Sequence, residues 1–285
     1  MALCATRAIN HIFFVKGLLE NFQVDKSEVM TESAFSVLYK AVSDENVGKV
    51  KSLIQLGGSV ISPTGFSLFC VAVKHGHVDI INAMAAAKDD INTPRNDGVT
   101  PLFIAAQSGH VNAIKALYTL GADVHIPNNC GITPVYIAAQ HGHADAIHTL
   151  ADLGGDVRTP NNHGVTPVLI AAQHGHSGAI KALYARGAAI STPNNRGVTS
   201  VYIAAQSGHA GAIHTLSTLG DDVNAPQKDG ATPMFIAAQN GHVDAIRTLC
   251  ALGADISTPN SREVTPMFIA SQLGHVDAIH ALSTL

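Results

Sequence analysis

Residues 131–163 read GITPVYIAAQHGHADAIHTLADLGGDVRTPNNH, and near-copies of this 33-residue stretch follow one another along the chain. The leading position of the copies is held by Gly65, Gly98, Gly131, Gly164, Gly197 and Gly230, with Glu263 in the same register. A unit this short cannot bury its own apolar face, so its copies must stack on one another. The spacing therefore predicts a solenoid with an exposed side that is open to a partner.

Each unit carries start and stop signals for two helices. In residues 131–163, Thr133 is placed to cap a first helix. Pro134 suits the first helical position, where its missing N–H would be unpaired anyway. Gly142 ends that helix as a left-handed cap, and Gly154 closes a second helix. The last eight residues of the unit contain a proline and two asparagines, which predicts a hairpin finger.

The unit opens with Thr-Pro and carries Ala-Ala and Gly-His at fixed places. With its order of helix, turn, helix and finger, it resembles the ankyrin repeat. The resemblance implies an all-α solenoid of stacked helix-turn-helix units with hairpin finger loops, in about eight repeats. We expect residues 1–31 to form a capping helix and its connection, 32–62 a degenerate first repeat, and 63–285 the second to eighth repeats, the last one truncated.

The chain departs from the Thr-Pro-Leu-His pattern of the family. The place of the histidine is taken by Phe103, Tyr136, Leu169, Tyr202, Phe235 and Phe268. One interpretation is that these side chains pack between repeats as ordinary core, because rings at repeating positions are mostly buried. The other is that they border the concave groove, where Tyr136 and Tyr202 offer hydroxyl groups to a partner. Both interpretations can hold together.

Positions that vary while the frame stays fixed are the better candidates for partner contact, because packing does not dictate them. Two such rows lie at the finger tip and at the end of the first helix, and in ankyrin proteins these parts line the concave face. The middle of the rows is basic when its histidines are protonated, which suits an acidic peptide near or below about pH 6.5. The expected partner-binding residues are Tyr136, His141, His163, His174, Arg196 and Tyr202.

Sixteen histidines raise the question of metal binding, above all in the His-Gly-His triplets at residues 75–77, 141–143 and 174–176. We expect the glycine of each triplet to turn the chain so that the two rings diverge. Equivalent rings in adjacent repeats should lie about 10 Å apart, beyond a shared ligand shell. The second histidine matches the Gly-His of the ankyrin pattern, where it is structural. No metal site is therefore predicted.

The composition argues against nucleic-acid, membrane and enzymatic functions. Charged residues make up 13% of the chain, and the net charge of -4 leaves no basic footprint for nucleic acid or an anionic membrane. There is no phosphate-binding loop and no nucleophile elbow, and we expect the pairs Asp89-Asp90 and Asp221-Asp222 to be solvated turn residues. We therefore expect no enzymatic activity, cofactor or small-molecule substrate.

The four cysteines have no paired spacing, which indicates free thiols in a reducing, intracellular and cytoplasmic setting. We expect a non-enzymatic scaffold that binds a partner protein or peptide on its concave and finger face. An alternative is the substrate-targeting region of a larger protein whose active domain lies beyond residue 285. Near-duplicate ankyrin arrays with neutral surfaces also resemble effectors that intracellular bacteria deliver into a host cytosol.

One modification site is suggested by a local resemblance. Residues 216–225 resemble the sequence that the asparaginyl hydroxylase of the hypoxia pathway recognises in ankyrin repeats. The resemblance implies Asn224 as the acceptor.

Overall fold

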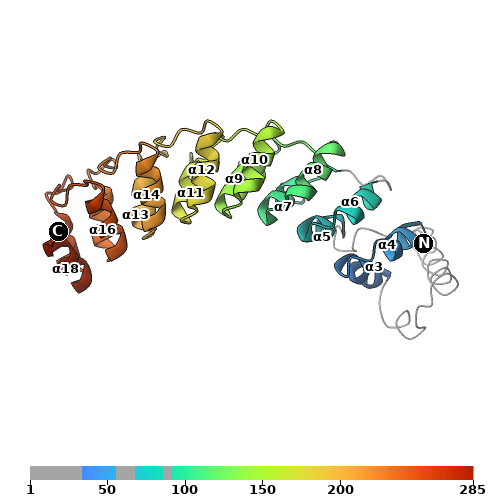
Figure 1. The fold of residues 1–285 in the computed structure, drawn as a ribbon, viewed down its shortest axis with the longest axis horizontal. Helices are drawn as coiled ribbons and strands as arrows, with labels where there is room; N and C mark the ends of the chain where they lie inside the picture. Colours follow the sequence, from blue (N-terminus) through green and yellow to red (C-terminus); the bar gives the residue numbers. More distant parts are fainter. Residues whose placement is uncertain (1–33, 56–67, 86–90, 285) are drawn as a thin grey trace, which may run out of the picture. The chain divides into compact units, whose positions relative to one another are not determined.

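The computed structural model describes residues 34–55, 68–85 and 91–284 (Figure 1). These residues form sixteen helices and no strand, so the all-α prediction is confirmed. The capping helix expected in residues 1–31 lies outside the described residues. The chain divides into two compact units, Met1–Asp123 (unit 1) and Val124–Leu285 (unit 2).

The described part of unit 1 consists of three helix pairs. Their first helices are α3 (Ala34–Ser43), α5 (Leu68–His75) and α7 (Pro101–Ser108), and their second helices are α4 (Val47–Gln55), α6 (Val78–Ala85) and α8 (Val111–Thr119). First helices pack on first helices in chain order, and second helices pack on second helices. The pair of α3 and α4 falls within the expected degenerate first repeat.

Unit 2 repeats this arrangement five times (Figure 1). Its first helices are α9 (Pro134–Gln140), α11 (Pro167–Gln173), α13 (Ser200–Gln206), α15 (Pro233–Gln239) and α17 (Pro266–Gln272). Its second helices are α10 (Ala144–Asp152), α12 (Ser177–Ala185), α14 (Ala210–Thr218), α16 (Val243–Ala251) and α18 (Val276–Thr284). Each layer packs in chain order, which is the solenoid that the 33-residue spacing predicts.

The expected helix signals are confirmed by the local geometry. The Oγ1 atom of Thr133 accepts a hydrogen bond from the Tyr136 N–H at 3.2 Å, and Pro134 begins α9 directly after it. Gly142 follows α9 with a φ of 77°, a left-handed conformation that glycine adopts without strain. The sequence thus sets both ends of the first helix.

Short side chains on the first helices and longer ones on the second helices build the core. Ala138 and Ala139 of α9 are fully buried, as are Ile147 and Leu150 of α10. Alanine allows adjacent first helices to approach closely, and the isoleucine and leucine fill the space between the layers. Each repeat therefore covers the apolar face of its neighbour.

The fingers are tight turns, each closed on a polar side chain. The Asn161 N–H donates to the Val165 carbonyl oxygen at 3.0 Å, and the Gly164 N–H donates to the Asn161 carbonyl oxygen at 2.9 Å. The Asn161 Oδ1 also accepts from the N–H groups of His163 and Val165, at 2.9 and 3.0 Å. The same side-chain contacts recur at Asn128, Asn194 and Asn260.

One joint between repeats of unit 2 contains a buried carboxylate. Asp221 is 5% exposed, and its Oδ1 accepts a hydrogen bond from the Asp222 N–H at 3.1 Å, whereas its Oδ2 is buried without a hydrogen bond. Burial raises the pKa of Asp221, although the Ser191 side chain and the Val201 backbone lie near it and act in the opposite direction.

The expectation that Asp221 is a solvated turn residue was therefore wrong. The physical reason is its register, because this position is core in the other repeats, where it holds Ala122, Gly155, Ala188 or Ala254. Its neighbour Asp222 is exposed, as expected. The pair Asp89-Asp90 lies outside the described residues.

Candidate interaction surface

The exposed candidates for partner contact lie at opposite ends of the first helices. His141 directly follows α9 and His174 directly follows α11, and both are exposed. His163 and Arg196 are also exposed, but they lie in the fingers that precede α11 and α13. A seven-residue helix is roughly 10 Å long, so α11 separates His163 from His174. These residues border an extended surface rather than one pocket.

Tyr136 and Tyr202 lie inside the stack, at 2% and 3% exposure. Burial raises the pKa of both hydroxyls to about 12, and the charge of Asp229 adds to the effect at Tyr202. The Tyr136 hydroxyl accepts a hydrogen bond from the Asn161 Nδ2 at 3.2 Å, which ties α9 to the following finger. This burial supports the core interpretation, and partner contact through the two hydroxyls stays a prediction.

The rings of the His-Gly-His triplets stack, so the expectation that they diverge was wrong. The ring centroids of His141 and His143 lie 6.2 Å apart with an interplanar angle of 15°, and those of His174 and His176 lie 6.1 Å apart at 8°. The left-handed glycine between the rings, with a φ of 77° at Gly142, turns the chain so that both rings face the same side.

The second histidine of a triplet, like the equivalent Gly-His histidine of other repeats, is held by the preceding repeat. The His176 ring lies over Gly142, where an added β-carbon would come within 2.7 Å of the His176 Nδ1. The His242 Nε2 forms a hydrogen bond with the Gln206 carbonyl oxygen at 3.0 Å. The same close approach to a glycine joins Gly175 with His209, Gly208 with His242 and Gly241 with His275. These contacts give the second histidine the structural place that the ankyrin pattern implies.

Five histidines of unit 2 influence one another electrostatically, and we call them the histidine cluster: His141, His143, His174, His176 and His209. Partial burial lowers the pKa of His141, and charges on His143, His174 and His176 lower it further. Burial also lowers the pKa of His176, against the opposing hydrogen bond to the Gln140 backbone, and three cluster members add to the lowering. Protonation of one histidine in the cluster therefore makes protonation of its neighbours less favourable.

The geometry of the cluster does not suit a shared metal ion. Over the residues that the structure describes, no three His, Cys, Asp or Glu side chains are grouped to hold one. The planes of the paired rings are nearly parallel, and their centroids lie 6.2 and 6.1 Å apart, instead of the rings converging on a point. The His174 Nδ1 also bonds to the Ile170 carbonyl oxygen of its own helix, at 3.0 Å.

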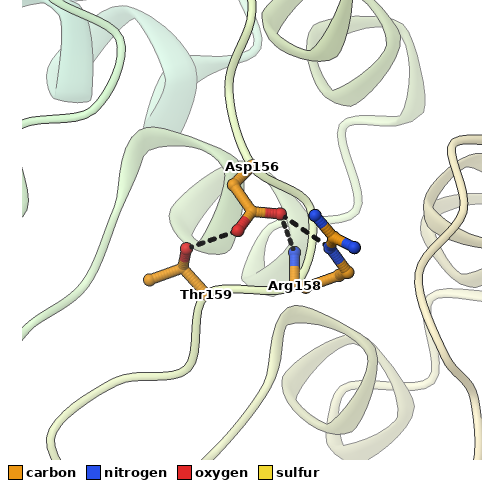
Figure 2. Close-up of polar contacts among 3 residues, drawn as sticks. All are labelled: Asp156, Arg158 and Thr159. Atoms are coloured by element: carbon orange, nitrogen blue, oxygen red, sulfur yellow. Dashed lines mark hydrogen bonds and ion pairs between the residues drawn. The ribbon is translucent and has the colours of Figure 1, made fainter.

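The turn after α10 is ordered by one carboxylate, as Figure 2 shows. The Asp156 Oδ1 accepts from the N–H and the Nε of Arg158, at 3.0 and 3.1 Å, and its Oδ2 accepts from the Thr159 Oγ1 at 3.1 Å. Burial acts to raise the pKa of Asp156, but the hydrogen bonds and the Arg158 charge outweigh it and lower the pKa. A hollow of about 240 Å³ beside this turn is also lined by Pro127 and Thr133.

A family model described as ankyrin repeats, in three copies, matches residues 38–128, 69–161, 102–194, 135–227 and 201–284. The chain belongs to the ankyrin repeat family. Its fold is similar to the crystal structure of the human ASB11 ankyrin repeat domain, with a TM-score of 0.69 and 24% sequence identity. The likeness covers 78% of this chain and 97% of that one, and at this identity it shows the fold alone. No curated protein matches the chain.

Asn224, the expected modification acceptor, is exposed at the end of an ankyrin repeat. Its side-chain Oδ1 accepts a hydrogen bond from the Asp255 N–H at 2.9 Å, and its own N–H donates to the Asp222 Oδ1 at 2.8 Å. Asn92 makes the same contact with Asp123 in unit 1, at 2.9 Å. In both units this asparagine links two successive ankyrin repeats.

Sequence reasoning placed His141 and His174 in a basic stretch, but it did not find His143, His176 and His209 beside them. The signal was present in the triplets, since a histidine on each side of a left-handed glycine recurs at the same place in consecutive ankyrin repeats. In the described part of the array, no helix combines the length and apolar character needed to cross a membrane.

Proposed function

We propose that this ankyrin array is a non-enzymatic scaffold that binds a partner protein or peptide across its first helices and fingers. The division of each repeat into a fixed, buried frame and a variable row outside the buried core supports the proposal. The Ala-Ala pair of α9, α11, α13 and α15 is fully buried in every case. The position directly after these helices changes from His141 and His174 to Ser207 and Asn240. Packing requires the first pattern but not the second.

Membership of the ankyrin family supports the same class of function. Ankyrin repeats generally serve as protein interaction modules, and the fold is typically a non-enzymatic scaffold. An interface of standard size, about 800 Å² on each partner, needs only several neighbouring repeats. The array in unit 2 offers five first helices in one row.

Affinity capture from a cell lysate, with the full chain as bait, tests the proposal. The site variant replaces His141, His163, His174 and Arg196 with alanine. We expect it to capture at least about tenfold less of the main partner than the wild-type chain, which corresponds to about 1.4 kcal/mol of binding free energy. Its melting temperature should stay unchanged, because all four side chains are exposed.

A matched control variant carries the same number of alanines on the second helices, at Lys181, His214, Arg247 and His280, which are exposed. It should capture the partner as well as the wild-type chain does. Equal capture by the site variant, or equal loss in both variants, would contradict binding across the first helices and fingers.

We also propose Asn224 as an acceptor for an asparaginyl hydroxylase. The exposed position of Asn224 supports this proposal, as does its place in the turn that ends the repeat, where its N–H donates to the Asp222 Oδ1. Co-expression with the hydroxylase of the hypoxia pathway, followed by peptide mass analysis, should show one added oxygen on Asn224. An Asn224→Ala chain provides the matched control, and an unmodified wild-type peptide would rule the site out.

A further inference from the structure

We propose that the histidine cluster is an acid-activated docking surface for an extended, carboxylate-rich peptide segment, which it binds with uptake of protons. This inference rests on the proposed function and names the partner chemistry and the regulation of one part of the same surface.

The arrangement of the rings is the first argument. The cluster occupies the same edge of three consecutive repeats, between α9 and α10, α11 and α12, and α13 and α14. Packed helices lie about 8–10 Å apart, whereas an extended polyproline II chain has three residues per turn and advances about 3.1 Å per residue. Carboxylates on every third residue of such a segment therefore lie on one side and match the repeat spacing. Each carboxylate would meet a stacked pair or, at His209, a single ring.

In the middle of the cluster, the adjoining helix ends carry no acidic residue. The helices α9, α11 and α13 contain no charged residue, and α12 and α14 have no acidic residue in their first turns. Acidic residues do begin the helices at both ends of the row, with Asp145 in α10 and Asp244 in α16. His242 closes the row on the α16 side, where it bonds to the Gln206 carbonyl oxygen.

In α12 and α14, small residues take the place of the aspartate that stands in the first turn of α10 and α16. Ser177 and Gly178 begin α12, and Ala210 and Gly211 begin α14. Both glycines are exposed, and no atom of a neighbouring repeat lies closer than 3.7 Å to the place where a β-carbon would be. An incoming carboxylate therefore meets neither a like charge nor a bulky side chain beside His174, His176 and His209.

The proton linkage follows from the contact of a carboxylate with a histidine ring. Without a partner, partial burial lowers the pKa values of His141 and His176, and charges on neighbouring members lower them further. A bound carboxylate supplies the opposite charge and raises the pKa of the ring that it contacts. The affinity is then fully developed below the pKa of the free ring, and it is lost as the pH rises through the pKa of the bound ring.

The test uses the full chain and two synthetic peptides. One peptide carries glutamate at every third position with glycine and serine between, and the other carries glutamine at the same positions. Isothermal titration calorimetry at pH 5.5 and pH 7.5, repeated in buffers of different ionisation enthalpy, reports affinity and proton uptake. We expect the glutamate peptide to bind at least about tenfold more tightly at pH 5.5, with net proton uptake. The glutamine peptide should show neither effect.

Two double variants separate the cluster from the general charge of the protein at low pH. His141→Gln with His174→Gln removes the exposed ring of each pair and should abolish most of the pH dependence. His214→Gln with His280→Gln removes two exposed histidines elsewhere, so the net charge changes equally, and it should bind like the wild type. The melting temperatures of both variants at each pH check the fold.

Affinity that is equal at the two pH values, or pH dependence that survives His141→Gln with His174→Gln, would overturn the inference. Lysate capture at pH 7.5 separates this failure from failure of the proposed function. A partner still lost by the four-alanine site variant at pH 7.5 would leave the scaffold function standing without acid activation. Capture that the site variant does not change would remove the proposed function itself.

Discussion

Phe235 and Phe268 hold the same position in neighbouring repeats of unit 2, yet they are 6% and 58% exposed. Their local structures are alike, because each N–H donates to the Oγ1 of a capping threonine at 3.2 Å. The difference is that α15 packs between two first helices, α13 and α17, whereas α15 is the one first helix that α17 packs against in the described part of the chain. The same side chain thus has a different energetic role, set by the neighbouring repeat.

The largest expected difference in stability between these two repeats comes from removing the phenylalanine rings. Phe235→Ala should lower the free energy of unfolding by about 3–5 kcal/mol, because it leaves a cavity between packed repeats. Phe268→Ala should lower it by about 1 kcal/mol or less, because most of its ring is already in water. Urea unfolding followed by circular dichroism measures both. Equal losses would show that the last repeat is as well covered as the interior.

Asp221 offers the next largest effect, because its Oδ2 is buried without a hydrogen bond. Asp221→Ala installs the residue of the neighbouring repeats and should raise the free energy of unfolding at pH 7 by about 1–3 kcal/mol. The reciprocal control Ala188→Asp should lower it by a similar amount, since Ala188 is buried at the equivalent position. A destabilised Asp221→Ala chain would show that the carboxylate supports the joint.

The pH dependence of this effect has a definite sign. Because the pKa of Asp221 is raised in the fold, the folded chain holds its proton to a higher pH than the unfolded chain does. The destabilising carboxylate charge is therefore present above the folded pKa and disappears below the unfolded pKa. Unfolding measured between pH 7 and pH 4 should show the advantage of Asp221→Ala shrinking as the pH falls. An advantage that grows on acidification would contradict the raised pKa.

A smaller difference in stability is expected between two of the finger turns. Asn161→Ala and Asn260→Ala each remove an acceptor for two backbone N–H groups, but only Asn161 also donates to a buried tyrosine hydroxyl, that of Tyr136. We expect Asn161→Ala to cost about 1 kcal/mol more than Asn260→Ala. In a Tyr136→Phe background this difference should vanish, and a difference that persists there would exclude the hydroxyl as its source.

The smallest expected effect on stability concerns Asp255, a carboxylate that orders its own turn. Asp255 of the last finger accepts hydrogen bonds from the Ser257 N–H and from the side chains of Ser257 and Thr258, which lower its pKa to about 2. Its contribution to stability is present above the unfolded pKa and is lost as the pH falls through about 2. NMR titration should place Asp255 below, and Asp221 above, the ordinary carboxyl range. Ser257→Ala removes one of the three hydrogen-bond donors and should raise the pKa of Asp255 part of the way toward the ordinary carboxyl value.

The helix ends and the fingers could be predicted from sequence because local chemistry decides them. Thr133, Pro134 and Gly142 act within one turn of their own positions, and the structure confirms each. Burial depends instead on the neighbouring repeat. This is why the sequence left two interpretations open for Tyr136, and why the turn chemistry around Asp221 was misleading.

The full histidine cluster was missed for a related reason. A left-handed glycine was correctly expected inside each triplet, but the direction of the flanking side chains depends on the full turn geometry. The link from one triplet to the next also needs the packed array, since His176 lies over a glycine 34 positions earlier, Gly142. Contacts at this separation are visible in the sequence only as a recurrence of the same two residues.

The histidine that lies over the glycine of the preceding repeat has a consequence for how such a gene can change in length. The contact is the same at four successive boundaries in unit 2. Recombination between equivalent codons of two repeats removes or adds a whole number of 33-residue periods, so each junction again places a histidine over a glycine. The array can therefore lengthen or shorten by unequal crossing-over while every new boundary keeps this histidine–glycine contact.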